Sequence, residues 1–271
     1  MTASTTNRSN SKMKGEKANL SRPAFAIWRR RVLVVILWTA VWEIMYHIIG
    51  RDIYFPSPLS TVQTFFALIT EKATWSTIAY SAYRTLFALC ASVLLGILFG
   101  IVCGLSRTMY NIFNPLVVVL KSTPVVSVII IAIIWFHSTY VPVFSGFLMC
   151  FPIVFTGTVA GIRNTDPKLI EMCRFYKVGR FDTLRSLYLR SSVPYINASV
   201  VSAIGICWKA VAAAEVLSMP VFSIGAKLYF AKTYLDPASL FAWTFIIILL
   251  SYFFETIYAK VSGYDKTGKY Q

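Results

Sequence analysis

Ionisable side chains within apolar runs are the residues of this sequence best suited to act on a charged solute. Lys209 lies near the middle of the run 197–217, and Glu215 follows it six residues later. If the run crosses a membrane, a charged side chain there is costly and marks a functional candidate. Lys209 could line a path for an anionic solute, or it could pair with Glu43 or Glu215. Six residues correspond to about 240° around a helix, so Lys209 and Glu215 cannot pair within one helix. Glu215 could line the path or lie at a membrane surface.

A second group of ionisable residues lies closer to the ends of the apolar runs. Lys121 precedes Pro124 by three residues, which suggests a gate or a lysine whose amine reaches the headgroups. Arg84 and the pair formed by Glu43 and His47, one helical turn apart, also lie near run ends. For these three residues we expect side chains that extend to the membrane surface.

Clusters that would support an enzyme or a metal site are missing from the sequence. The chain has eleven acidic residues and two histidines, His47 and His137, with no D-x-x-D or H-E-x-x-H pattern. Its five cysteines form no C-x-x-C pair, so neither a zinc site nor a disulfide framework is expected. No G-x-x-x-x-G-K-[ST] phosphate loop occurs, so bound ATP and Mg²⁺ would have to reside in another subunit.

The composition indicates a membrane protein. Hydrophobic residues make up 57% of the chain and charged residues 14%, with a mean hydropathy of +0.64. The net charge of +15 is concentrated in a few segments between apolar runs, which does not resemble a nucleic-acid-binding surface. We therefore expect an all-α polytopic membrane protein and no nucleic-acid partner.

About six segments are long and apolar enough to cross a bilayer, which requires roughly 20 residues each. They are 32–49, 79–104, 115–136, 141–161, 197–217 and 239–259. Only four residues separate the third from the fourth, which predicts a tight helical hairpin. Residues 53–78 resemble an amphipathic surface stretch. Gly96, Gly100 and Gly104 form a small-residue ridge suited to close helix packing.

The Lys and Arg residues of the loops predict the orientation. With a cytoplasmic N-terminus, nineteen of the 26 lie on the cytoplasmic side and four on the outside. Both ends are therefore expected inside, with 1–31 as a basic disordered tail, 32–260 as the membrane domain and 261–271 as a second tail.

The longest internal loop, 162–196, predicts a structured cytoplasmic element. Asp166-Pro167 is a helix-start signal, an interrupted apolar periodicity follows, and Gly179 is expected to separate two short helices. A basic loop resting on anionic lipid headgroups is the alternative. The apolar stripe favours docking of a soluble partner.

This loop resembles the coupling loop of binding-protein-dependent ABC transporter permeases, whose signature is EAA, three residues, Gly, nine residues and I-x-L-P. Glu171 matches the family's Glu, and Pro194-Tyr195-Ile196 matches its end. Lys177 replaces the usual glycine, so Gly179 is expected to shift the turn by two residues. The resemblance implies an ATPase-coupling loop with these residues: Glu171, Arg174, Lys177, Gly179, Asp182 and Arg185.

The resemblance extends over about residues 30–260, to the nitrate/sulfonate/taurine-type permeases. The matching fragments are Trp42-Glu43, 55–58, 120–126, Trp208-Lys209, Ala214-Glu215, 223–225 and 240–244.

Membership in this family would imply a pair of six-helix permeases in a bacterial inner membrane. Two ATPase subunits would dock on the coupling loops, and an external binding protein would deliver a small solute, most plausibly an anion such as a sulfonate or nitrate. The expected path or gate residues are Lys209, Glu215, Lys121 and Pro124. The alternative is a passive channel or a scaffold, with a membrane-embedded enzyme less favoured.

Overall fold

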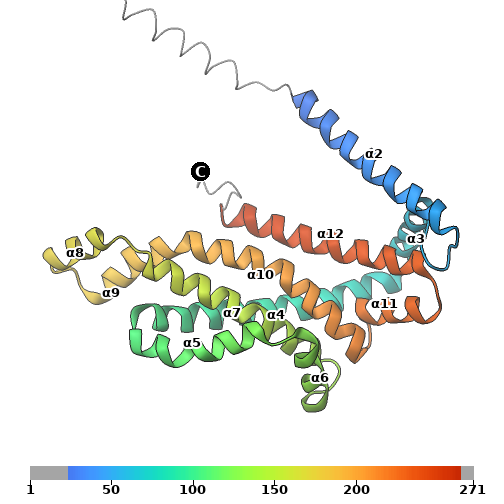
Figure 1. The fold of residues 1–271 in the computed structure, drawn as a ribbon. Helices are drawn as coiled ribbons and strands as arrows, with labels where there is room; N and C mark the ends of the chain where they lie inside the picture. The colour runs from blue at the N-terminus through green and yellow to red at the C-terminus, as the bar shows by residue number, and fades with distance from the viewer. Residues whose placement is uncertain (1–23, 264–271) are drawn as a thin grey trace, which may run out of the picture. The chain divides into compact units, whose positions relative to one another are not determined.

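The computed structural model describes residues 24–263, and its contacts divide the chain into a first unit, 1–60, and a second unit, 61–271. The first unit contains helix α2 (Ala24–Ile49), after which Gly50 adopts a left-handed conformation with φ of 63°. The indole N–H of Trp42 donates to the carbonyl of Pro56, which folds the following segment back (Figure 1). Residues 24–31 of the expected tail, in which disorder is predicted only up to about Pro23, are helical. The remainder of that tail and residues 264–271 lie outside the described residues.

The second unit is built from helices alone over the described residues. In chain order they are α3 (Pro58–Thr70, which begins at the unit boundary), α4 (Lys72–Leu105), α5 (Arg107–Ser122), α6 (Val125–Trp135), α7 (Val141–Arg163), α8 (Pro167–Phe175), α9 (Arg180–Thr183), the π-helical turn η1 (Leu184–Tyr188), α10 (Leu189–Ser218), α11 (Ile224–Thr233) and α12 (Pro237–Val261). Within residues 24–263, five helical stretches are long and apolar enough to span a membrane, and there are six if the bent pair of α5 and α6 forms one span. The expected all-α polytopic fold is confirmed.

The bent pair corrects the third expected span, 115–136. Helix α5 begins eight residues earlier, and α6 departs from it at an angle of 100° after a break at residues 123–124. Pro124 lacks an N–H and restricts Thr123 to an extended conformation, with ψ of 127°, so the helix cannot continue through this point.

The stretch 53–78 is also divided rather than continuous. Its centre forms α3, in which Phe65 and Leu68 pack against Ile224 and Trp243, so this face is covered by protein. Helix α4 already begins at Lys72. The expectation of one amphipathic surface stretch was therefore wrong.

Helices α4 and α7 are in close contact in the core. A Cβ at Gly96 would lie 2.9 Å from the Val154 Cβ. One at Gly100 would lie 2.6 Å from the Thr158 Cβ, and one at Gly104 would lie 2.9 Å from the Ile162 Cβ. The contacting residues recur every four positions on both helices, so each glycine of α4 packs against one side chain of α7. The small-residue ridge is confirmed as a packing surface.

Helix α7 lies between α5 and α10 (Figure 1). Its contact with α10 is equally close, because Gly157 faces Ser199 and Gly161 faces Ser192. Phe151 and Phe155 form the contact with α5 through Val117. The core of the second unit thus surrounds α7, and the helices around it position the residues described next.

Candidate functional site

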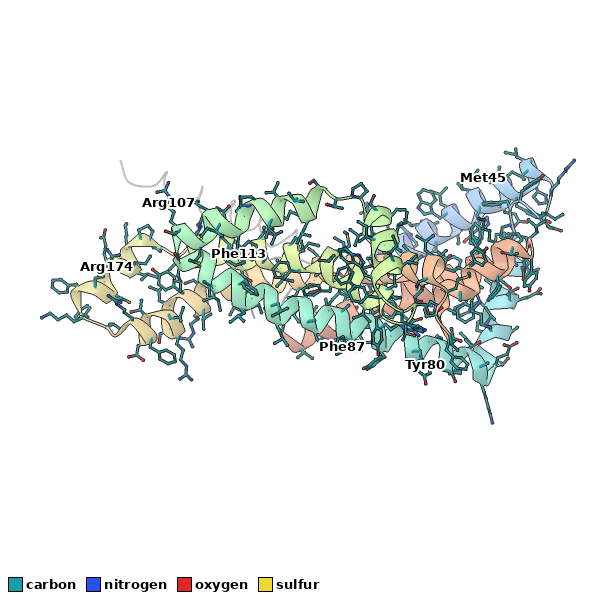
Figure 2. The ribbon with its side chains drawn as sticks, turned by 90° about the horizontal axis from the view of Figure 1, so that it is seen from below. Met45, Tyr80, Phe87, Arg107, Phe113 and Arg174 are labelled. Atoms are coloured by element: carbon teal, nitrogen blue, oxygen red, sulfur yellow. The ribbon has the colours of Figure 1, made fainter. Side chains whose placement is uncertain are left out.

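The predicted coupling element lies at one end of the second unit. Helix α8 begins as expected, because the Asp166 carboxylate accepts a hydrogen bond from the Lys168 N–H at 2.9 Å and Pro167 occupies the first turn. Figure 2 shows Arg174 at the far end of this region, beyond Arg107, with Tyr80 toward the opposite end. The predicted docking residues all have exposed side chains or, for glycine, an exposed backbone: Glu171, Arg174, Lys177, Gly179, Asp182 and Arg185.

The turn after α8 differs from the expected one. Lys177 adopts φ of 52°, and the Val178 N–H donates to the carbonyl of Cys173 at 2.9 Å, which closes a Schellman-type helix end. Gly179, with φ of −56°, starts α9 instead. The turn therefore remains at the family's glycine position, occupied here by a lysine, and is not shifted to Gly179.

The second half of the loop is a helical extension rather than a separate short helix. Residues 180–218 form one continuous helical stretch of 39 residues, made of α9, η1 and α10. Pro194 lies inside it instead of ending the loop. The helix that contains the expected fifth span, 197–217, therefore begins at residue 180, and its first turns belong to the predicted loop.

Large apolar side chains are exposed at this end. Phe175, Tyr176 and Phe181 expose 82%, 71% and 72% of their surface, respectively. A cavity of about 660 Å³ lies between α8 and the start of the long helix, and Arg174 and Phe181 line it. Exposed aromatic rings beside charges of both signs are typical of a surface that another protein covers.

The opposite end of the unit contains a buried ion pair. Arg84 Nη1 lies 3.0 Å from Glu215 Oε1, and the two side chains are 5% and 1% exposed. The Ser81 hydroxyl donates to the same carboxylate at 2.8 Å, and the Gly225 N–H donates to it at 3.1 Å. Arg84 therefore points into the protein and does not extend outward from its helix as expected, and the Glu215 carboxylate is enclosed by the chain.

The same cluster fixes the segment before α11. Arg84 donates to the carbonyls of Val221 and Phe222 at 3.0 and 3.1 Å. Met219 and Phe222 have φ of 44° and 50°, a strained conformation for residues with a side chain. The guanidinium satisfies carbonyls that this irregular backbone would otherwise leave unpaired, so Arg84 holds α11 against α4 and α10.

Lys209 lies on the exposed face of α10, and no ion pair within residues 24–263 involves it. Of the two acids considered as its partner, Glu215 lies in the same unit and binds Arg84 instead. The structure therefore does not contain the Lys209–Glu215 pair, and pairing with Glu43 of the first unit stays a prediction.

Lys121 lies one residue before the end of α5 and fourteen residues, about 21 Å, from its start. Its amine donates to the Thr156 hydroxyl of α7 at 3.2 Å. Pro124 is exposed at the break between α5 and α6.

Sequence reasoning did not identify Ser81, Arg84 or Thr156 as partners of the predicted residues. The only feature of the sequence that could have indicated the buried pair is that Arg84 and Glu215, which have opposite charges, each lie within an apolar run. Hydrogen-bonding residues such as serine and threonine are too common in membrane helices to indicate a specific partner.

Comparison with known proteins agrees with this geometry. Residues 96–262 match the model of the family described as "Binding-protein-dependent transport system inner membrane component". The aliphatic sulfonates transport permease protein SsuC of Bacillus subtilis (strain 168) is 24% identical over 225 residues, covering 82% of this chain and 81% of that protein. The nitrate import permease protein NrtB of Synechococcus elongatus (strain ATCC 33912 / PCC 7942 / FACHB-805) is 25% identical over 197 residues, covering 69% and 70%.

Among solved structures, an amino acid ABC transporter crystallised with histidines shares the fold. Its TM-score is 0.56 at 16% sequence identity, and the match covers 73% of this chain and 95% of that chain. The resemblance to nitrate/sulfonate-type permeases is confirmed by the relatives. Because the family model matches well over half of its length, this chain belongs to the binding-protein-dependent transport system inner membrane components, which are permeases of ABC importers and not enzymes.

Proposed function

We propose that this chain is the membrane-spanning half of an importer that takes up a small anion. Two copies form the transport path and alternate between outward-open and inward-open states. Two ATPase subunits, which bind ATP and Mg²⁺, dock on α8 at the cytoplasmic face, and an external binding protein delivers the solute. The N- and C-termini lie in the cytoplasm of a bacterial cell, and the bilayer is its inner membrane.

The observation that carries this proposal is the exposed end formed by α8 and α9. A loop that only rested on lipid headgroups would need basic residues alone. Here Glu171 and Asp182 are exposed beside Phe175 and Phe181, which suits a protein partner with both apolar and charged contacts. A passive channel or a scaffold gives no reason for this element.

The anionic solute is supported by charge and by the relatives. Lys209 and Lys121 are cationic, exposed and within membrane-spanning helices, whereas the acid Glu215 is neutralised by Arg84. The relatives named above import sulfonates and nitrate. An aqueous path lined by unpaired ammonium groups would concentrate anions.

Association with an ATPase tests the coupling element. We would co-express this chain with the ATPase encoded nearest to it and measure co-purification in detergent. Glu171→Ala and Phe175→Ala should lose the ATPase, while Glu71→Ala, an exposed acid outside this loop, should keep it. If no ATPase binds the inserted wild-type chain, the channel and scaffold alternatives gain support.

Transport by reconstituted proteoliposomes tests the solute class. The assay would supply ATP inside, add the neighbouring binding protein, and compare uptake of nitrate, taurine and methanesulfonate with that of uncharged amides. Lys209→Met should abolish anion uptake but preserve assembly and basal ATP hydrolysis. Unchanged uptake by Lys209→Met would refute its role in the path.

A further inference from the structure

The part of the α7 surface between α5 and α10 is not covered by another described helix of the unit. Helix α5 covers one side through Phe155, and α10 covers another through Gly157. Between these contacts a strip of α7 stays partly exposed, and its residues recur at three- and four-residue intervals along one face: Met149, Ile153, Thr156 and Ala160. The strip thus runs along α7 with α5 on one side and α10 on the other (Figure 1).

Lys121 reaches onto this strip from α5. Its amine donates to the Thr156 hydroxyl at 3.2 Å, and that hydroxyl donates to the carbonyl of Pro152 at 2.7 Å. An ammonium group has three donors, so two remain for a ligand. Thr156 therefore fixes the cation in place without neutralising its charge.

Lys209 approaches the same side of the unit from α10. It shares an exposed face with Ser202 and Ala213, which lie seven residues before and four residues after it. Ala213 packs against a buried cluster that includes Ile129 and Ala132 of α6 and Val141 of α7. Ile206, three residues before the lysine, is 39% exposed, whereas a Cβ at Gly205 would have no neighbour within 4 Å.

The contact of Gly157 with Ser199 shows how far apart Lys121 and Lys209 lie along the axis of α10. Thr156 adjoins Gly157, so Lys121 lies at the level of Ser199. Lys209 is ten residues further along α10, about 15 Å toward the end that carries α11. Ser202 lies between these two levels.

At this depth α4 presents large apolar side chains on its exposed face. On α4, Leu94 and Leu98 are 70% and 57% exposed, as expected for side chains that contact lipid. An unpaired lysine on such a surface would be costly, because it would remain in hydrocarbon. The face with Lys121, Ser202 and Lys209 therefore requires water.

We propose that Lys209 and Lys121 are successive contact points for the anion on one water-filled wall, Lys209 first and Lys121, positioned by Thr156, second. This rests on the proposed function and adds the order of contacts and the positioning residue. The anion leaves the first ammonium group for the second, whose level lies about 15 Å away along the axis of α10. Two moderately attractive points hold the anion less tightly than one deep site, so it can move on.

Cysteine labelling tests the wall without knowledge of the natural solute. Cys90 and Cys173, the cysteines that are not buried, are first replaced by alanine. Ser202→Cys is then reacted, in the complex held in lipid nanodiscs, with anionic methanethiosulfonate ethylsulfonate or with its cationic trimethylammonium counterpart. The anionic reagent should react at least about fivefold faster, because two cations flank the thiol.

Leu98→Cys is the matched control. It lies on α4 between Gly96 and Gly100, which face Val154 and Thr158, so its depth matches that of Thr156. This thiol should react with neither reagent, since thiolates form poorly in lipid. If the Ser202→Cys variant folds poorly, it is replaced by Ala198→Cys, which lies one turn away on the same face of α10.

Charge removal completes the test. Lys209→Met and Lys121→Met should each reduce the preference for the anionic reagent severalfold, and Thr156→Val should reduce it less. Equal reactivity of the Ser202→Cys and Leu98→Cys thiols, or a preference that persists without both lysines, would overturn the inference. Because labelling needs neither solute nor ATP hydrolysis, such a result would leave the coupling proposal intact. Conversely, a chain that binds no ATPase can still be labelled as expected.

Discussion

The two ends of the second unit treat charge in opposite ways. At the end with α11, Arg84 and Glu215 are buried and every contact of their cluster is made within the chain. At the end with α8, Glu171 and Arg174 are exposed beside uncovered aromatic rings. The buried charges at the first end bind and position the chain's own backbone, whereas the exposed charges at the second end are free to contact another molecule. Substitutions at the first end should therefore cost stability, and those at the second should cost association.

The largest loss of stability is expected for Arg84→Met. This change leaves the Glu215 carboxylate buried without a counterion and should lower the free energy of unfolding by about 3–5 kcal/mol. The measurement is unfolding by sodium dodecyl sulfate in mild detergent. Arg174→Met, at the exposed end, is the matched control and should change the free energy of unfolding by less than about 0.5 kcal/mol. Equal stability of the two variants would remove the contrast between the ends.

A smaller loss is expected for Gly100→Ala. The new Cβ would lie 2.6 Å from the Thr158 Cβ, so α4 and α7 must separate, at about 1–3 kcal/mol. Gly205→Ala on the open face of α10 should be neutral or stabilising by less than about 1 kcal/mol. The same unfolding assay compares them, and a similar loss in both variants would contradict the close contact of α4 and α7.

Lys177→Gly should increase local stability by about 1 kcal/mol, since glycine adopts a positive φ without the steric cost of a side chain. Hydrogen exchange at the Val178 amide, which is bonded to Cys173, should slow about fivefold. Arg174→Gly, within the helical part of α8, should instead accelerate exchange by a similar factor. Faster exchange in Lys177→Gly would mean that the lysine stabilises the turn through its side chain.

The smallest effect on stability is expected for Phe175→Ser. The ring is 82% exposed, so its loss should change the free energy of unfolding by less than about 0.5 kcal/mol. Co-purification of the ATPase should nevertheless fail. A marked loss of stability would show instead that the ring supports the fold.

Features set by local sequence were predicted well. The apolar runs gave the fold class and about six spans, and the glycine ridge gave a real contact because its four-residue period is a local property. Asp166-Pro167 marked the start of α8 correctly.

Features that depend on distant residues were not predicted. Arg84 and Glu215 are 131 residues apart, and no local pattern connects them. The start of α5 at Arg107 was missed because its polar residues resemble a loop, although helices extend beyond the apolar core of a membrane. The glycine-based turn was misplaced because Lys177 tolerates a conformation that glycine would adopt more easily.

The helical stretch of 39 residues joins the two ends that were compared above. Phe181 and Lys209 lie on this one rod, about 42 Å apart, so a tilt of about 5° applied at the first would displace the second by about 4 Å. The π-helical turn at 184–188 and Pro194 are the two places where the rod can yield. Stiffness at these two points therefore sets how far a displacement of Phe181 is transmitted to Lys209.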